Sequence, residues 1–420
     1  MRGNTMNLRM NRKKLNIGAY WLQPYAGTEE HVRDIAACHI DMMVCVHEAM
    51  RDTLDHFKTY GVGAVVVGAV PGWWGGNGKS GEMAECNPLC DYEKAAKTFV
   101  DHPAIWAIDV GDEPNALDFP HYGKVVDYVE QAFPSQYAFL NLFPNYALST
   151  QNGQADAASQ LGTKTYQEHI DQYCDHVNLD YISYDFYMYP PRYDSVVGHF
   201  YENFRVVADK CLETNKSLWV VLQVNAEKPE VQLSENYLRY QGNAALAWGA
   251  ETIMWACYCA GWWTNNVLDT EGNKTPQYEK LQKVNAELHR IGESYMRYRR
   301  VATHCVGFNG TCWLENSKLT SIDAFANDVF SGVRELDGNP LLIGEMVSRN
   351  GKGGKAMMIC AADDPFDRGG RINRVVFSVP KGKTVRTYTG NGTIVPMRLA
   401  DGNFCVDLPS GYGVLVTAED

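Results

Sequence analysis

Residues 16–263 alternate short apolar runs with longer amphipathic stretches, and this alternation constrains the fold more than any other feature of the chain. The apolar runs have the length and the β-branched or aromatic content of strands, whereas the stretches between them repeat apolar residues at helical spacing. The expected strands span residues 16–22, 41–47, 62–70, 105–110, 137–142, 181–185, 218–224 and 252–257. Eight strand and helix pairs in roughly 250 residues predict a (β/α)8, or TIM, barrel.

The remainder of the chain predicts a second, different domain. Short strand-like runs at 356–360, 374–379, 385–388, 404–408 and 413–417 are separated by Gly, Asn, Asp and Pro turns. We therefore expect an N-terminal tail (1–15), an α/β barrel (16–297) and a C-terminal antiparallel, sandwich-like β domain (298–420). A doubly wound sheet is excluded because no GxGxxG turn follows the first strand.

Charge and composition limit the partners. The net charge of -12 repels nucleic-acid phosphates and anionic lipids, and no apolar run approaches the roughly 20 residues that span a bilayer. The basic N-terminus lacks the apolar segment of a secretion signal, and the 12 cysteines are scattered through expected strands and helices as reduced core residues. We expect a cytoplasmic protein without a cofactor, and the sequence does not indicate its oligomeric state.

Two groups of residues contain metal-binding types, but a metal site is the less favoured interpretation of both. Cys86 and Cys90 lack an obvious second pair of ligands, and His47 and Glu48 lack converging histidines from other strands. We therefore predict no metal, and a metal-dependent hydrolase is only a third alternative.

The fourth expected strand ends at two adjacent carboxyls. Asp109 and Gly111 alternate with bulky Ile108 and Val110, so the small or polar residues should face the barrel interior. On that alternation Glu113 points inward and Asp112 points away. In the alternative reading, Asp112 caps the next helix and Glu113 is a solvated loop acid.

A second inward carboxyl is expected at the end of the sixth strand. Tyr181, Ser183, Asp185 and Tyr187 share one face, which places Asp185 across the barrel mouth from Glu113. One protonated and one ionised carboxyl are the minimum for glycosidic bond cleavage. Asp185 could instead be structural, fixing Tyr hydroxyls or loop amides.

Aromatic residues cluster in the loops after the third, sixth and eighth strands. Aromatic faces stack on the apolar faces of sugar rings, so we expect several of these residues to bind an oligosaccharide, with loop packing as the alternative for each. The candidates are Trp73, Trp74, Tyr184, Tyr187, Trp255 and Trp262.

The run His102-Pro103-Ala104-Ile105-Trp106, followed by Asp112-Glu113-Pro114, resembles the clan A (β/α)8 glycoside hydrolases, most nearly the branch similar to family 42 β-galactosidases. Leu142-Phe143-Pro144-Asn145-Tyr146 and the trailing β domain support the resemblance, which covers about residues 16–293. It implies that Glu113 is the acid/base residue. The resemblance also implies that the protein is a glycosidase, whose specificity it does not indicate. Further sugar-binding candidates are Asp112, Gln223 and Asn145.

Two positions depart from the clan pattern. Asp112 stands where the clan has Asn, and Gln223 stands at the end of the seventh strand where the clan has its nucleophilic Glu. An amide cannot form a covalent glycosyl intermediate. Three alternatives remain: Asp185 is the second carboxylate, Glu227 reaches back from the next loop, or the chain binds glycans without cleaving them.

Overall fold

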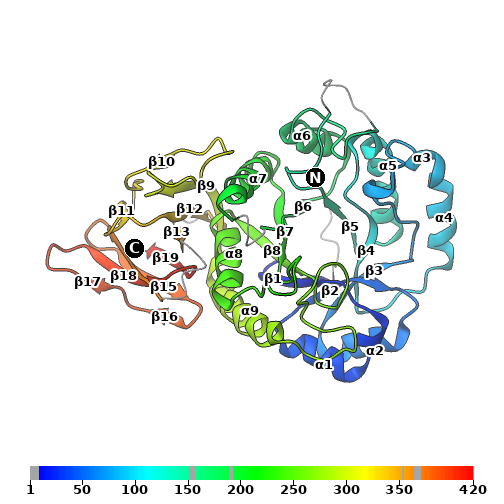
Figure 1. Cartoon of the computed structure of the whole chain (residues 1–420), viewed down its shortest axis with the longest axis horizontal. Coiled ribbons are helices and arrows are strands. Elements are labelled where there is room, and N and C mark those ends of the chain that lie inside the picture. The colour runs from blue at the N-terminus through cyan, green and yellow to red at the C-terminus, as the bar shows by residue number, and fades with distance from the viewer. Residues whose placement is uncertain (1–8, 151–156, 189–192, 352–353, 364–369, 420) are drawn as a thin grey trace.

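The computed structural model describes residues 9–150, 157–188, 193–351, 354–363 and 370–419. Eight parallel strands close into a barrel in sequence order (Figure 1). The strands are β1 (Asn16–Tyr20), β2 (Met42–His47), β3 (Gly63–Val67), β4 (Ile105–Asp112), β5 (Tyr137–Leu142), β6 (Tyr181–Asp185), β7 (Ser217–Gln223) and β8 (Ala250–Ala256). The predicted (β/α)8 architecture is confirmed.

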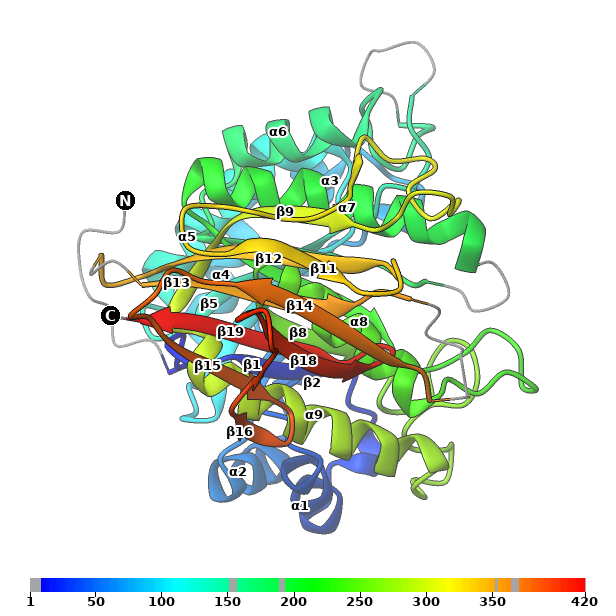
Figure 2. The ribbon, with the colours of Figure 1, turned by 90° about the vertical axis from the view of Figure 1, so that its left-hand side faces the viewer.

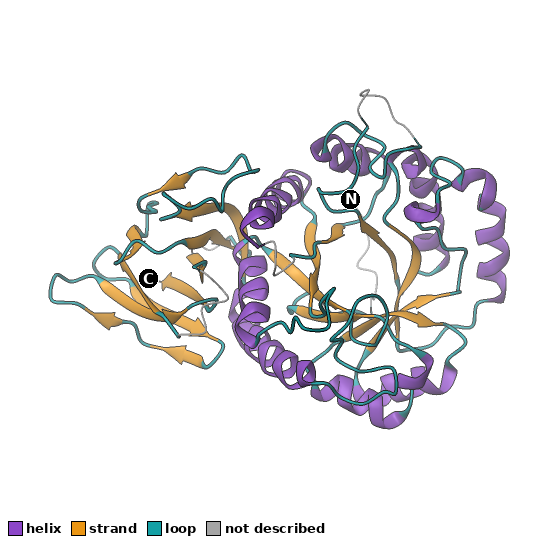
Figure 3. Cartoon of the chain, in the orientation of Figure 1, coloured by secondary structure: helices purple, strands orange, loops and turns teal. Residues whose placement is uncertain are grey.

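Helices surround this barrel (Figure 3). They are α1 (Glu29–Ala37), α2 (Arg51–Tyr60), α3 (Met83–Cys86), α4 (Leu89–Thr98), α5 (Phe119–Ala132), α6 (Tyr166–His176), α7 (Tyr193–Thr214), α8 (Glu235–Ala247) and α9 (Pro276–Tyr295). Side-chain caps fix several starts: the Thr165 hydroxyl accepts from the Glu168 amide, and Ser234 accepts from the Tyr237 amide. Within the described residues, no helix has both the length and the apolar character needed to cross a bilayer.

Stacked aromatic rings fill the interior of the barrel. Trp219 of β7 stacks on Tyr181 of β6, with ring centroids 3.9 Å apart, and also contacts Tyr137 and Phe139 of β5. All four side chains are at most 1% exposed. Because this part of the interior is closed by apolar packing, polar groups at the other end of the strands can meet only at the barrel mouth.

The C-terminal region forms two sheets, which confirms the predicted β domain. A seven-stranded sheet has the order β10-β9-β12-β13-β19-β15-β16, and a four-stranded sheet has the order β11-β14-β18-β17. The strands are β9 (Tyr298–Val306), β10 (Ser321–Ile322), β11 (Ser331–Glu335), β12 (Leu341–Ser348), β13 (Lys355–Ala361), β14 (Ile372–Ser378), β15 (Thr384–Thr389), β16 (Gly392–Ile394), β17 (Met397–Arg398), β18 (Phe404–Pro409) and β19 (Gly413–Glu419). Neighbouring strands are antiparallel except β9 and β10.

The long strands β9 and β12 were not predicted. Strand β9 carries two arginines and a histidine among its apolar residues, and β12 contains Gly344, so neither shows clean alternation. Gly344 has a tertiary role, because a Cβ at this position would lie 2.3 Å from the Ala247 carbonyl oxygen in α8. The seven-stranded sheet therefore approaches the barrel helices closely at this position.

The seven-stranded sheet packs against α7, α8 and α9, and Figure 2 shows its strands lying over these helices. A buried arginine on α8 lies at the junction. Arg239 is 3% exposed, and its guanidinium donates to Glu287 of α9 at 2.5 and 2.9 Å and to Glu235 at 2.5 Å. Its guanidinium also lies 4.1 Å from the ring centre of Tyr412, which precedes β19. One cation thus links two barrel helices to the β domain.

Replacing Arg239 by Met should destabilise the protein by about 3 kcal/mol, because Glu287 is left buried without its cation. The double variant Arg239→Met/Glu287→Met should recover most of that loss, since it removes both charges. Guanidinium denaturation of the three proteins measures the effect. Equal stability of the single and double variants would contradict a buried ion pair at this junction.

Candidate active site

Three carboxyls gather at the carboxyl ends of β4 and β6, around one amide from β5. The Asn141 Nδ2 donates to Asp185 Oδ1 at 3.0 Å and to Asp112 Oδ1 at 3.3 Å. The Asn141 Oδ1 in turn accepts from the Ser183 hydroxyl at 2.8 Å, which fixes the orientation of the amide. Because the same Nδ2 atom donates to both, the Oδ1 atoms of Asp112 and Asp185 lie close together.

The expectation that Asp112 points away from the interior was wrong. The pairing of β4 with β5 shifts register between Asp109 and Gly111, where the strand has a bulge. A Cβ at Gly111 would lie 2.1 Å from the Tyr122 hydroxyl of α5, so this position faces the outer helices. The bulge reverses the alternation, and Asp112 joins the inward carboxyls.

Glu113 lies beside this pair in a left-handed backbone conformation, with a φ of 46°. Its backbone amide donates to the Asn141 carbonyl at 2.8 Å, and its Oε2 accepts from the Trp74 indole N–H at 3.0 Å. The loop that carries Trp74 fits tightly here, because a Cβ at Gly75 would lie 1.7 Å from the Glu113 carbonyl oxygen. Both Asp112 and Glu113 remain partly exposed.

Burial and mutual repulsion favour the protonated forms of these acids. Burial, followed by the charge of Glu113, raises the pKa of Asp185 and that of Asp112 well above their usual range. Burial also raises the pKa of Glu113, against the opposing effect of the Trp74 hydrogen bond. Deeper in the barrel, burial raises the pKa of Asp109 to about 7. Such a cluster retains protons near neutral pH, which is what general acid chemistry requires.

Aromatic side chains lie around the carboxyls. Tyr187 packs near Trp262 and Trp263, with ring centroids 6.2 and 5.4 Å apart, and Trp262 packs edge-on against Trp21 at 5.3 Å. Burial, together with the charge of Asp185, raises the pKa of Tyr187 well above 10. The Tyr187 hydroxyl is thus a neutral hydrogen-bond donor near the acids.

Of the predicted site residues, Glu113, Asp185, Asp112, Tyr187, Trp74 and Trp262 are brought together. Trp74 is 52% exposed beside Glu113, so its ring is open to a ligand. Asp185 is only 4% exposed, which is less than Asp112 or Glu113.

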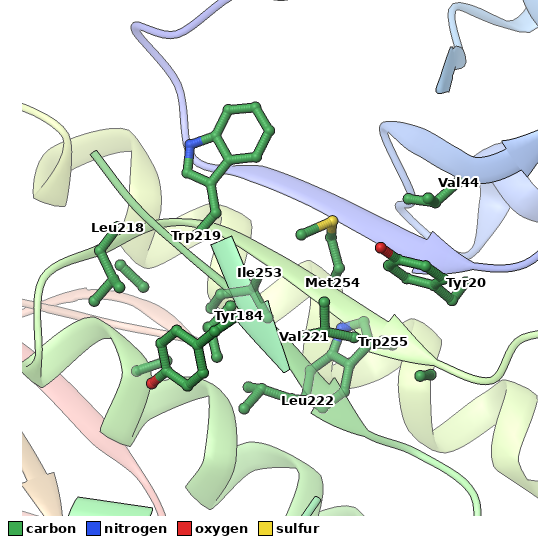
Figure 4. Packing of buried hydrophobic residues seen from close by; sticks show 14 of the residues in the cluster. Tyr20, Val44, Tyr184, Leu218, Trp219, Val221, Leu222, Ile253, Met254 and Trp255 are labelled. Carbon is green, nitrogen blue, oxygen red and sulfur yellow. The ribbon is translucent and has the colours of Figure 1, made fainter. Parts of the chain in front are cut away.

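Four predicted sugar-binding residues lie elsewhere, and these assignments are corrected. Tyr184 is fully buried against Phe204 of α7, and Figure 4 shows it with Leu222 on the side of the strands opposite to Trp219. The Trp255 indole donates to Asn285 of α9 at 2.9 Å. These strand residues alternate away from the interior.

The other two of the four, Trp73 and Asn145, are loop residues held by neighbouring structure. The Trp73 indole donates to the buried Asp118 at 3.3 Å. The Asn145 amide donates to the His199 carbonyl at 2.8 Å and its backbone N–H to Asn203 at 2.7 Å, both in α7. Both side chains therefore order the loops that carry them.

Gln223 shares its face of β7 with the inward Trp219, yet the structure leaves it no exposed surface. Its Nε2 donates to the Asn225 carbonyl at 2.9 Å, and its backbone is held by the Gln241 side chain. Direct contact with a ligand would require a rearrangement. Glu227 is exposed in the loop that follows.

Three contributors to the site were missed. Asn141 is the one polar residue in the apolar run of β5, which was a usable signal. No comparable sequence pattern indicated Tyr20 at the end of β1 or Tyr146 after β5. Burial, followed by the charge of Asp112, raises the pKa of Tyr20 well above 10. Tyr146 is 48% exposed, and its ring packs edge-on against Phe186, which directly follows Asp185. Among the described residues, no group of three or more His, Cys, Asp or Glu is arranged to hold a metal ion.

Comparisons with known proteins identify the fold. No protein-family model and no curated protein matches the chain. A family 39 glycoside hydrolase from Bacteroides cellulosilyticus WH2 is similar in structure over 98% of this chain and 82% of its own, with 12% identity and a TM-score of 0.50. Two further structures also align with this chain. An endo-β-1,4-mannanase from Thermotoga petrophila has 10% identity and a TM-score of 0.45, over 96% of this chain and 93% of its own. A glucosidase from Croceicoccus marinus has 12% identity and a TM-score of 0.44, over 97% of this chain and 96% of its own.

The raised pKa of Asp109 predicts a pH-dependent stability. Because the folded pKa of about 7 exceeds the ordinary 3.8, the contribution of Asp109 is fully present below about pH 4 and is lost as the pH rises through 7. The variant Asp109→Asn should therefore gain roughly 2 kcal/mol or more over the wild type at pH 8 and almost nothing at pH 4. Denaturant titrations at both pH values measure this difference. The control variant Asp127→Asn, on the exposed face of α5, should change the free energy of unfolding by the same small amount at pH 4 and at pH 8.

Proposed function

We propose that this protein is a glycoside hydrolase that cleaves O-glycosidic bonds of oligosaccharides with two carboxyls. The observation that carries the proposal is the shared amide of Asn141, which holds Asp112 and Asp185 together beside Glu113 at the barrel mouth. Catalytic groups of barrel enzymes lie at this end of the strands. The family 39 glycoside hydrolase that shares the fold is consistent with the same chemistry.

Glu113 is the general acid in this mechanism. It is partly exposed, so it can reach the leaving oxygen of a bound sugar, and burial raises its pKa, which favours the protonated form that a general acid needs. The exposed ring of Trp74, held to Glu113 by a hydrogen bond, provides a stacking surface for the sugar next to that proton.

Asp185 is the second carboxylate, acting as base or nucleophile. When Glu113 holds the proton, its charge no longer raises the pKa of Asp185, and the Asn141 amide stabilises the ionised form of Asp185 by donating to it. Asp112 accepts from the same amide and binds a sugar hydroxyl, and its charge keeps a proton on the cluster. Tyr187 and Trp262 complete the sugar site. A cluster of acids suits neutral or cationic sugars and disfavours anionic ones.

We also infer membership of the clan A barrel glycoside hydrolases, on the branch similar to family 42 β-galactosidases, from the motifs at 102–106 and 112–114. A cytoplasmic location, with substrates already imported, agrees with the lack of a disulfide among the cysteines, seven of which are buried.

Exchanging Glu113 for Gln should lower kcat on a cleavable glycoside at least 1,000-fold, because the amide cannot donate the proton. Asp185→Asn should lose a similar factor, whereas Asp112→Asn should lose about tenfold, since an amide still binds a hydroxyl. A chromogenic glycoside screen, followed by proton NMR of the product anomer, measures both activity and stereochemistry. Glu227→Gln is the matched control and should retain activity. If this variant were inactive, Glu227 and not Asp185 would be the second catalytic carboxylate.

The Trp74 hydrogen bond predicts the direction of a pH effect. This bond lowers the pKa of Glu113, so Trp74→Phe should raise that pKa and move the alkaline limb of the kcat profile to higher pH by about half a unit. The control Trp73→Phe removes an indole that donates to Asp118 and should leave the limb in place. An equal shift of the alkaline limb of the kcat profile in Trp74→Phe and Trp73→Phe would argue against Glu113 as the general acid.

A sugar-binding protein without hydrolytic activity is the second candidate. It is favoured by the burial of Asp185 and by Gln223 at the position where the clan has its nucleophile. Sugar binding measured by calorimetry, with no cleavage across the glycoside screen and no loss of binding in Glu113→Gln, would support this candidate over the hydrolase.

A further inference from the structure

A cavity of about 740 Å³ lies at the end of the barrel opposite to the carboxyls. Its walls include Asp180 and Lys216, which directly precede β6 and β7, and Gly249, which precedes β8. The far wall is supplied by Arg299 and Arg300 of β9 and by Arg349 after β12. The cavity therefore lies between the amino-terminal face of the barrel and the β domain. Its volume is typical of small-molecule sites.

The charge of this cavity is opposite in sign to that of the whole chain. Five basic side chains line it against two acidic ones, although the protein as a whole carries a net charge of -12. The basic residues are Arg12, Lys216, Arg299, Arg300 and Arg349, and the acidic residues are Asp180 and Glu251. Like charges brought together in this way repel one another unless an anion is bound between them.

Both lining acids already have partners. Asp180 accepts from Arg12 at 2.5 Å, and Glu251 accepts from Arg349 at 2.5 Å. Arg300 pairs instead with Asp209, outside the lining, at 2.8 Å. The remaining two cations have no carboxylate among the described residues: Lys216 donates to the Leu179 carbonyl, and Arg299 is exposed.

Two of the three arginines on the far wall, Arg300 and Arg349, are held in place before any ligand binds. The Arg300 side chain is 7% exposed, and its guanidinium lies 5.3 Å from the ring centre of Trp248. The Arg349 Nε donates to the Tyr298 carbonyl at 2.8 Å. Guanidinium groups fixed in this way bind the oxygens of phosphates and carboxylates with little loss of side-chain entropy.

We propose that this cavity is a second binding site, for a small organic anion that carries at least two negative charges on phosphate or carboxylate groups. The excess of basic groups favours a multiply charged ligand, and the volume of about 740 Å³ can hold a ligand of the size of a sugar phosphate or a tricarboxylate. Lys216 and Arg299 are the cations that such an anion would neutralise.

The test is calorimetric titration of the full chain with glucose 6-phosphate, citrate and inorganic phosphate at low ionic strength. We expect one site per chain for at least one organic anion, with weaker binding of inorganic phosphate, and a rise in Tm because the ligand bridges the barrel and the β domain. Binding of glucose 6-phosphate alone would identify a phosphorylated sugar, and binding of citrate alone a polycarboxylate. No binding of any of the three would overturn the proposal.

A matched pair of variants tests the location. Arg299→Glu should weaken binding at least tenfold, because it places a negative charge in the lining. Arg334→Glu makes the same change of charge at an exposed position of β11, outside the cavity, and should change affinity less than twofold. Equal weakening in both variants would show a general effect of net charge and would overturn the assigned site. Circular dichroism of each variant confirms that it is folded.

Discussion

Closure of the parallel barrel is the constraint on which the rest of the structure depends. Because all eight strands run in one direction, their carboxyl ends form one rim and their amino ends another. The stack of Trp219 on Tyr181 closes the interior between the two rims. Polar residues at strand ends consequently meet at one rim or the other, and the two rims can carry different chemistry.

At the carboxyl rim the structure holds acids close together. Gathering Asp112, Glu113 and Asp185 is unfavourable when all are ionised, since the charge of Glu113 raises the pKa of both Asp112 and Asp185. The Asn141 amide and the Trp74 indole offset part of this repulsion by donating to the carboxylates. The net effect of burial and repulsion still raises the pKa of all three acids and favours their protonated forms.

At the amino rim the charge is reversed, and the β domain contributes to it directly. Arg300 and Arg349 pair with Asp209 and Glu251 of the barrel region, so the ion pairs that join the two parts also place cations in the cavity between them. The junction at Arg239 on α8 lies in the same contact between the parts. The β domain thus both supports the barrel and forms one wall of the proposed anion site.

The periodicity of the sequence determined the eight strands, the barrel and the β character of the C-terminal region, because burial imposes a local pattern on each strand. The order of the strands also predicted that Glu113 and Asp185 lie at the same rim, since the carboxyl ends of parallel strands share one rim. The bulge at Gly111, which turns Asp112 inward, has no local pattern, because it depends on the fit of Tyr122 from α5. For the same reason, only the tertiary structure decided that Tyr184 and Trp255 face the helices, that Asn141 joins the acids, and that distant cations meet beneath the barrel.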